Sequence, residues 1–170
     1  MTSIQSTKPS SGSVTLHVNG ESTQVAAVLH DTLLTVLRER LQLTAAKRGC
    51  NQGVCGACTI SIDDAPMRAC LSLAHNCEQA QVRTLEGLQD CPHMQALQAA
   101  FARAGAFQCG FCTPGMLVSA RALLLRNPDP DAQAIRSALS GNLCRCTGYV
   151  KIIDAVRTAA SALRLEGAAS

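Results

Sequence analysis

Hydrophobic residues recur at alternate positions near the start of the chain. Val14, Leu16 and Val18 are separated by polar residues, and Val25 resumes the same pattern after Asn19-Gly20. Alternation of this kind is typical of a strand with one buried face, and Asn-Gly is favoured in the type I′ turn of a hairpin. The sequence therefore predicts a β-hairpin as the first folded element.

The next apolar residues, between positions 33 and 41, follow a helical period instead, and Asp31 or Thr32 is suited to cap the helix. Extended patterns return at residues 59–62 and 81–85. A hairpin, a crossing helix and further short strands together predict an α+β domain.

Beyond residue 88 the hydrophobic period becomes 3.6 residues and stays so. Thr113 is suited to cap one of these helices, because Pro114 then takes the first helical position. Two consecutive helix hairpins predict a four-helix bundle. The four expected helices cover about residues 92–104, 114–126, 131–140 and 150–164.

Ten cysteines in 170 residues change this picture of an ordinary mixed fold. Cys50, Cys55, Cys58 and Cys70 have the spacing C-x4-C-x2-C followed by a fourth cysteine, which is the plant-type 2Fe-2S pattern. Glycines among residues 49–58 would let the backbone wrap closely around a cluster and aim amide N–H groups at its sulfurs. A four-cysteine zinc site is the alternative, although such sites usually pair two short knuckles.

A second quartet consists of Cys109 and Cys112, then Cys144 and Cys146. The spacing C-x2-C then C-x-C fits zinc or an iron-sulfur cluster. The neighbouring first quartet favours iron, because two redox centres in one small chain form a relay. Each pair precedes a predicted helix, so the positive helix ends would face an anionic cluster.

The remaining cysteines, Cys77 and Cys91, are expected to be buried free thiols that pack as small apolar groups. His17, His30, His75 and His93 are scattered along the chain, and we do not expect any of them to bind metal.

Composition and charge exclude several function classes. One Tyr, three Phe and no Trp provide too few rings for a surface that stacks single-stranded nucleic acid. The formal charge of +3 counts every cysteine as neutral. Two oxidised clusters with four thiolates each would add about −4 and leave roughly −1. The absence of an apolar leader or a membrane-length apolar run, together with cysteines at ligand spacing, favours a cytoplasmic protein.

Three motifs carry a resemblance to a known family. Gly49–Thr59, Gln108–Gly115 and Asn142–Tyr149 resemble the iron-sulfur small subunits of the molybdenum hydroxylases. This is the xanthine oxidase and aldehyde oxidoreductase family, which includes the small chains of bacterial carbon monoxide dehydrogenase and of N-heteroaromatic oxidoreductases. The resemblance covers about residues 13–163 and includes all eight ligand cysteines in order.

The resemblance implies an α+β protein with two domains. A β-grasp, plant-type ferredoxin domain is expected at residues 13–87, and an all-α 2Fe-2S domain, the four-helix bundle, at residues 88–165. Residues 1–12 and 166–170 are expected to be tails.

The resemblance also implies roles and partners. Gln108 and Cys146 match positions beside the pterin of the molybdenum cofactor, which a large partner subunit holds. Electrons would pass from that cofactor to the second quartet's cluster, then to the first, and on to FAD in a medium subunit or to a cytochrome c subunit. We therefore expect an oxidoreductase subunit without a substrate pocket of its own, in a heterotrimer or a dimer of heterotrimers.

Two other functions remain open at this point. A stand-alone two-cluster ferredoxin or redox sensor would have a hydrophilic surface around the second cluster, whereas a subunit would expose apolar area there. A zinc-binding interaction module would be colourless.

Overall fold

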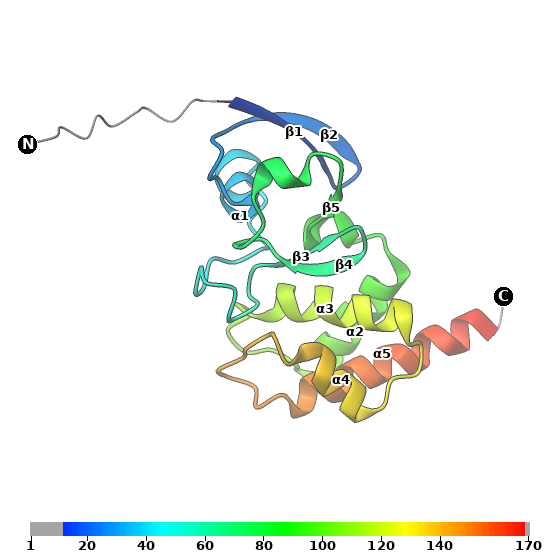
Figure 1. Cartoon of the computed structure of the whole chain (residues 1–170). Helices are drawn as coiled ribbons and strands as arrows, with labels where there is room; N and C mark the ends of the chain where they lie inside the picture. The colour runs from blue at the N-terminus through cyan, green and yellow to red at the C-terminus, as the bar shows by residue number, and fades with distance from the viewer. Residues whose placement is uncertain (1–11, 169–170) are drawn as a thin grey trace, which may run out of the picture.

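The structure is a computed structural model that describes residues 12–168, in which a sheet lies above a layer of helices (Figure 1). The N-terminal tail expected at residues 1–12 lies outside the described residues except for Gly12, which opens the first strand. Within the described part of the chain, no helix combines the length and the apolar character that a membrane crossing requires.

The predicted hairpin is present as β1 (Gly12–Val18) and β2 (Glu21–Ala27), paired antiparallel. Asn19 has φ 54° and Gly20 has φ 89°, the two positive values that a type I′ turn requires. The expected turn is therefore confirmed.

Among the described residues the sheet has five strands in the order β2-β1-β5-β3-β4, of which β1 and β5 are parallel. The strands β3 (Thr59–Ile62) and β5 (Gln81–Arg83) were predicted, and β4 (Ala65–Arg68) was not. Its second residue, Pro66, cannot donate a ladder hydrogen bond, and such a residue is tolerated because β4 lies at the sheet edge.

A helix covers the sheet, as the sequence predicts. It begins as α1 (Leu33–Thr35), continues as the π-helical turn η1 (Val36–Arg40), and is capped by Thr32, whose Oγ1 accepts from the Thr35 amide at 3.2 Å. Along the chain between β4 and α2 lie two 3-10 turns, η2 (Ala74–Cys77) and η3 (Leu85–Leu88).

The four longer helices begin within one residue of their predicted starts. They are α2 (Pro92–Ala104), α3 (Thr113–Arg126), α4 (Ala132–Leu139) and α5 (Val150–Ala168). The last runs to residue 168, so residues 166–168 are helical and not the tail that we expected, while residues 169 and 170 lie outside the described residues.

The predicted cap of α3 is wrong by one position. Cys112 is the N-cap, and Thr113 is the first helical residue. The Thr113 hydroxyl is buried without a hydrogen-bond partner. Cys112 takes the cap position without a side-chain cap hydrogen bond.

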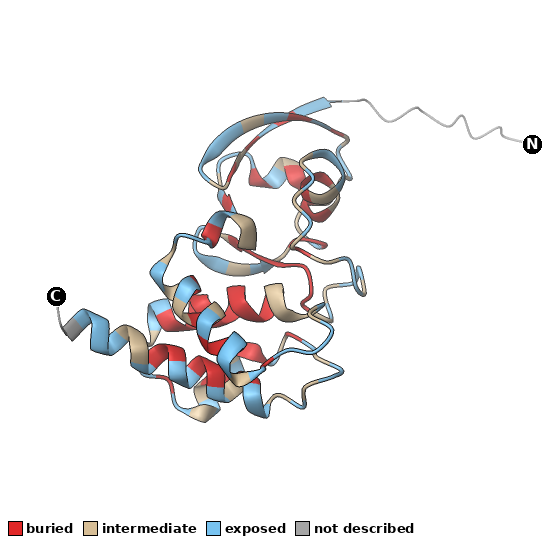
Figure 2. Cartoon of the chain, turned by 180° about the vertical axis from the view of Figure 1, so that it is seen from behind, coloured by how far each residue is buried: buried red, intermediate tan, exposed pale blue. Residues whose placement is uncertain are grey.

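Helix α3 lies between the sheet and the other helices. It packs against β3 and β4 on one side and against α2 and α4 on the other. Every residue from Gly115 to Leu124 is buried, and the visible turns of this part of the helix are red in Figure 2. A helix buried on all faces sits inside a protein, so α3 is the element that joins the two layers.

Each layer has its own hydrophobic core. Leu16, Leu34 and Val82 belong to the core formed by the strands and the helix α1–η1. Leu97 and Ile152 belong to the core between the helices. The sheet layer with its covering helix is a ferredoxin-like domain, and the second layer is a helical domain.

Candidate iron-sulfur sites

The loop between η1 and β3 surrounds the sulfurs of Cys50 and Cys55 with backbone amides. The amides of Cys55 and Gln52 donate to Cys50 Sγ at 3.3 and 3.4 Å, and the Cys50 amide donates to Cys55 Sγ at 3.4 Å. The amides of Cys55 and Gln52 lower the pKa of the Cys50 thiol to about 6. Donors of this kind stabilise the thiolate, which is the form of cysteine that binds metal.

Glycines make this wrapping possible, as the sequence predicts. Gly53 and Gly56 have φ 76° and 71°, values that a side chain would disfavour. At Gly49 the constraint is space, because a Cβ there would lie 2.8 Å from Cys55 Sγ. The glycines therefore let the backbone of the loop lie directly against the sulfurs, without side chains between them.

Cys58 and Cys70 form the second pair of the first quartet, and both are buried. Burial, followed by the proximity of Cys70, raises the pKa of the Cys58 thiol to about 11. A thiol with this pKa is protonated at neutral pH unless a cation replaces the proton. Binding of metal here therefore releases a proton.

The second quartet gathers where the α2–α3 loop meets the α4–α5 loop. Cys109 Sγ and Cys146 Sγ lie 3.7 Å apart on the surface, and Cys112 faces Cys144 in a partly buried position. Burial, with a smaller contribution from Cys144, raises the pKa of Cys112 to about 12. Burial also opposes ionisation of Cys144, but hydrogen bonds outweigh it and lower the Cys144 pKa, the first of them donated by the Thr147 hydroxyl at 3.1 Å.

The eight sulfurs are thus arranged as four pairs, which suits two-iron clusters. Each iron of a 2Fe-2S cluster takes two cysteine sulfurs, and two sulfurs on one tetrahedral metal with bonds of about 2.3 Å lie about 3.8 Å apart. The 3.7 Å between Cys109 and Cys146 matches that separation. Within residues 12–168, no group of three or more His, Cys, Asp or Glu side chains is arranged to hold a single metal ion.

The two remaining cysteines have partners elsewhere. Cys77 is buried, and its thiol donates to the Leu73 carbonyl at 3.4 Å. Cys91 accepts from Arg121 Nε at 3.4 Å, and Arg121 Nη1 also pairs with Asp64 at 3.1 Å. Arg121 is only 6% exposed, so this contact ties the helical domain to the β3–β4 turn.

The loop between η1 and β3, the first cysteine loop, directly contacts the α4–α5 loop that carries Cys144 and Cys146, the second cysteine loop. The Leu143 amide donates to the Cys55 carbonyl at 2.8 Å. One hydrogen bond thus connects a member of the first quartet to the residue that precedes Cys144 of the second. Beside it, Asn142 is 2% exposed and donates from Nδ2 to the Gly56 carbonyl at 3.0 Å. Asn142 Oδ1 accepts from Ser119 at 2.8 Å, so α3 is part of the same contact.

This contact between the domains leaves no room for a side chain. A Cβ on Gly115, in the first turn of α3, would collide with the Gly56 carbonyl, and a Cβ on Gly56 would collide with the Gly141 carbonyl. Arg68 also crosses the boundary, donating to the Gly141 carbonyl at 2.6 Å and to Thr59 Oγ1 at 2.7 Å. The relative position of the two loops is therefore fixed by close packing and hydrogen bonds.

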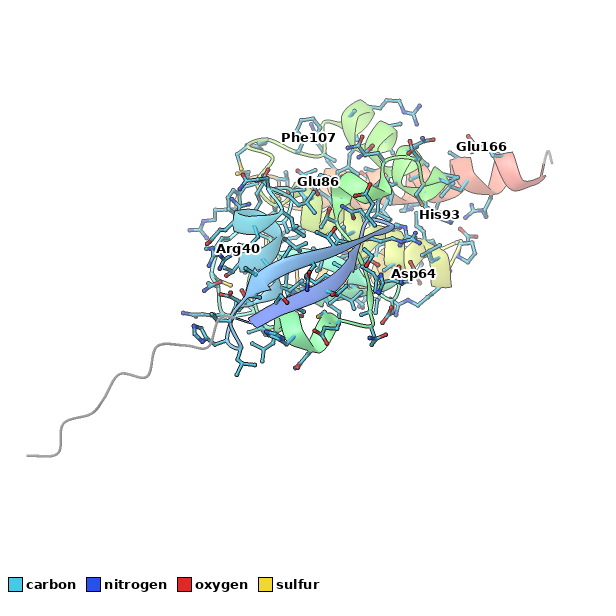
Figure 3. All side chains as sticks on the ribbon, turned by 90° about the horizontal axis from the view of Figure 1, so that it is seen from above. Arg40, Asp64, Glu86, His93, Phe107 and Glu166 are labelled. Atoms are coloured by element: carbon cyan, nitrogen blue, oxygen red, sulfur yellow. The ribbon has the colours of Figure 1, made fainter. Side chains whose placement is uncertain are left out.

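Gln108 and Cys146 lie together at the exposed end of the second quartet. Gln108 Nε2 donates to the Cys146 carbonyl at 2.9 Å, which joins the α2–α3 loop to the α4–α5 loop. Large apolar side chains are exposed on the same loops and on the first cysteine loop; Figure 3 shows Phe107 at the rim of the molecule. These side chains are Val54, Phe107, Phe111, Leu143 and Val150.

The basic residues before the first quartet have local partners. Arg38 donates to the carbonyls of Thr44 and Ala46 at 2.9 and 2.8 Å, and Arg48 pairs with Glu39. They brace the segment that leads into the first cysteine loop.

Reasoning from the sequence found the cysteines but missed the residues that join their loops. Asn142 and Arg68 make these contacts, and Tyr149 holds the loop that carries Asn142 through the Cys144 amide. The available signals were an asparagine two residues before a candidate ligand cysteine and the single tyrosine in a chain with few aromatic residues.

Comparison with protein families places a 2Fe-2S iron-sulfur cluster binding domain at residues 5–100 and a [2Fe-2S] binding domain at residues 84–157. The chain is 47% identical over 146 residues to the nicotinate dehydrogenase small FeS subunit of Eubacterium barkeri, covering 86% of this chain and 93% of that one. It is 49% identical over 143 residues to the nicotine 6-hydroxylase small subunit of Paenarthrobacter nicotinovorans, covering 84% and 86%.

Among solved structures, quinoline 2-oxidoreductase from Pseudomonas putida 86 matches with a TM-score of 0.85 and 46% identity, over 91% of this chain and 97% of that chain. The aldehyde oxidoreductase from Desulfovibrio desulfuricans matches with a TM-score of 0.84 and 46% identity, over 91% of this chain but 17% of the other. A similar fold thus occurs both as a chain of this length and within a much longer one.

The fold and the paired thiols define an electron-transfer protein with two 2Fe-2S centres. The chain belongs to the family of iron-sulfur small subunits of the molybdenum hydroxylases. It is an oxidoreductase subunit that transfers electrons within a heteromeric complex, as the sequence predicts.

Proposed function

We propose that each of the two cysteine quartets holds one cluster and that the two clusters have different roles in electron transfer. One 2Fe-2S cluster is held by Cys50, Cys55, Cys58 and Cys70, and the other by Cys109, Cys112, Cys144 and Cys146. Each bound cluster supplies reversible one-electron chemistry. The observation that carries this assignment is the grouping of all eight sulfurs into four close pairs, with the Cys55 carbonyl of one quartet bonded to the loop that carries Cys144 and Cys146.

The two quartets have different places in the complex. The second is closer to the surface, with Cys109 and Cys146 exposed, and it lies among exposed apolar side chains. We assign this end to the large subunit, with Gln108 and Cys146 beside the pterin of its molybdenum cofactor. The first quartet then passes electrons to FAD in a medium subunit, or to a cytochrome c subunit in its place.

The remaining features of the proposal concern organisation. The separate hydrophobic cores support domains at residues 13–87 and 88–165, the second a four-helix bundle. We propose a heterotrimer or a dimer of heterotrimers as the assembly. A cytoplasmic location suits eight cysteines that must stay reduced to bind iron.

A Cys112→Ser variant tests the order of the two centres in the purified complex. We expect the second cluster to be lost or altered, the first to remain assembled, and reduction of the first cluster by substrate to stop. Electron paramagnetic resonance after substrate and after dithionite separates these effects, with Cys91→Ser as the control that keeps both clusters. Normal reduction of both centres by substrate in Cys112→Ser would contradict the assignment.

The alternative of a stand-alone ferredoxin fits the surface less well. A free carrier would have polar residues around its second cluster, whereas Phe111 is 46% exposed and Val150 67% exposed beside it. Exposed apolar groups that cluster in this way mark a contact surface.

A further inference from the structure

The single tyrosine of the chain has an unusual position beside the second quartet. Tyr149 has φ 68°, in the left-handed region that bulky residues rarely adopt, and it follows Gly148 with φ 65°. Left-handed backbone at a non-glycine residue persists only where the surrounding contacts hold it, and such residues gather at functional sites.

The two ends of the Tyr149 side chain contact different parts of the molecule. The side chain is partly buried and packs against the hydrophobic core of the helical domain. The hydroxyl accepts from the Cys144 amide at 2.8 Å and donates to the Asn142 carbonyl at 3.2 Å. A rigid ring therefore connects the helical core to the loop that carries two of the proposed ligands.

The Tyr149 hydroxyl forms hydrogen bonds to this loop on both sides of Leu143. Its partners belong to the residues immediately before and after Leu143, while the Leu143 side chain itself is exposed. The Leu143 amide points the other way and donates to the Cys55 carbonyl at 2.8 Å. With its neighbours held from one side, Leu143 has its N–H directed at the first cysteine loop.

We propose that Tyr149 is a positioning residue for the contact between the two cysteine loops. Its hydroxyl orients the Asn142–Cys144 segment so that Leu143 N–H stays bonded to Cys55, and it thereby sets the coupling between the two iron sites. This inference rests on the proposed ligands, but it can be tested in the chain without any partner subunit.

The test compares two replacements of the same size at position 149 in the full chain with both clusters assembled. One is 4-aminophenylalanine, whose amino group can donate and accept at the place of the hydroxyl. The other is 4-methylphenylalanine, which fills the same space without hydrogen bonds. The readouts are hydrogen exchange of residues 142–146 and the magnetic interaction between the two reduced clusters in electron paramagnetic resonance.

We expect the amino variant to behave like the natural chain. The methyl variant, like Tyr149→Phe, should show faster exchange of this segment and a weakened or altered magnetic interaction. Thr158→Val, which deletes a hydroxyl on an exposed face of α5 bonded to the Asp154 carbonyl, should change neither readout.

Equal behaviour of the amino and methyl variants would overturn the proposal, whether both retain the natural coupling or both lose it. This outcome is distinct from a failure of the proposed function. In that case the predicted partner subunits would not purify with the chain, while the two iron signals of the isolated chain remained coupled.

Discussion

The Cys55 sulfur leaves no room for a side chain at residue 49. Because a Cβ at Gly49 would lie 2.8 Å from Cys55 Sγ, any larger residue must displace either the sulfur or the chain. We expect Gly49→Ala to weaken or abolish the first cluster and leave the second. Iron content and the two resonance signals measure this, with Gly167→Ala as the control, since a Cβ there meets nothing within 4 Å.

The two cysteines outside the quartets, Cys77 and Cys91, should differ in reactivity. Burial, then Asp63, raises the pKa of Cys77. At Cys91 burial also opposes ionisation, but the hydrogen bond and charge of Arg121, together with the Met94 and His93 amides, outweigh it and lower the pKa. We expect iodoacetamide to modify Cys91 at a lower pH than Cys77 in the intact protein. Mass spectrometry of the labelled chain measures both rates, and equal rates at all pH values would contradict the role given to Arg121.

The lowered pKa of Cys91 also predicts how stability depends on pH. A depressed pKa in the folded state means that the thiolate adds stability above the ordinary thiol pKa of about 8.5. This contribution is lost as the pH falls through the folded pKa. The loss of stability in Cys91→Ser, measured by urea unfolding, should therefore be larger in alkaline than in acidic buffer.

At the scale of elements, Asn142 joins three of them. Its amide contacts α3 through Ser119, and it contacts the first cysteine loop and β3 through Gly56 and Thr59. Removing it leaves buried polar partners without hydrogen bonds, which costs about 1–3 kcal/mol for each such group. We expect Asn142→Ala to lower the free energy of unfolding by about 2–4 kcal/mol, against little change for the exposed Asn76→Ala.

The sequence predicted elements far better than the contacts between them. Helix starts follow from periodicity and Pro residues, and Asn19-Gly20 specifies its turn locally. The strand β4 escaped because Pro66 masks it, and the cap of α3 was displaced because cysteine is not a residue that favours caps. The bond between Leu143 and Cys55 joins residues 88 positions apart, and no local pattern encodes it.

The cysteine pairs show the same limit. Spacing grouped the candidate ligands into quartets, but it could not show that Cys109 faces Cys146 while Cys112 faces Cys144. That pairing depends on how the α2–α3 and α4–α5 loops approach each other, which is a property of helix packing.

For the whole molecule, the apolar rim around the second quartet predicts where the large subunit binds. We expect Phe111→Asp or Val150→Asp to reduce recovery of the large subunit in co-purification, because a buried unpaired charge opposes association. Leu165→Asp is the control, since Leu165 is 74% exposed near the far end of α5. Equal recovery of all three variants would show that the rim is not the contact.

The close fit of Gly56 against Gly115 and Gly141 bears on how electron flow can be regulated. Two domains that meet without space for a methyl group, and that share buried hydrogen bonds, are held in one relative position by these contacts. The chain should then behave as a rigid conductor whose internal spacing stays constant through every turnover. Any gating by motion must arise where this subunit meets its neighbours.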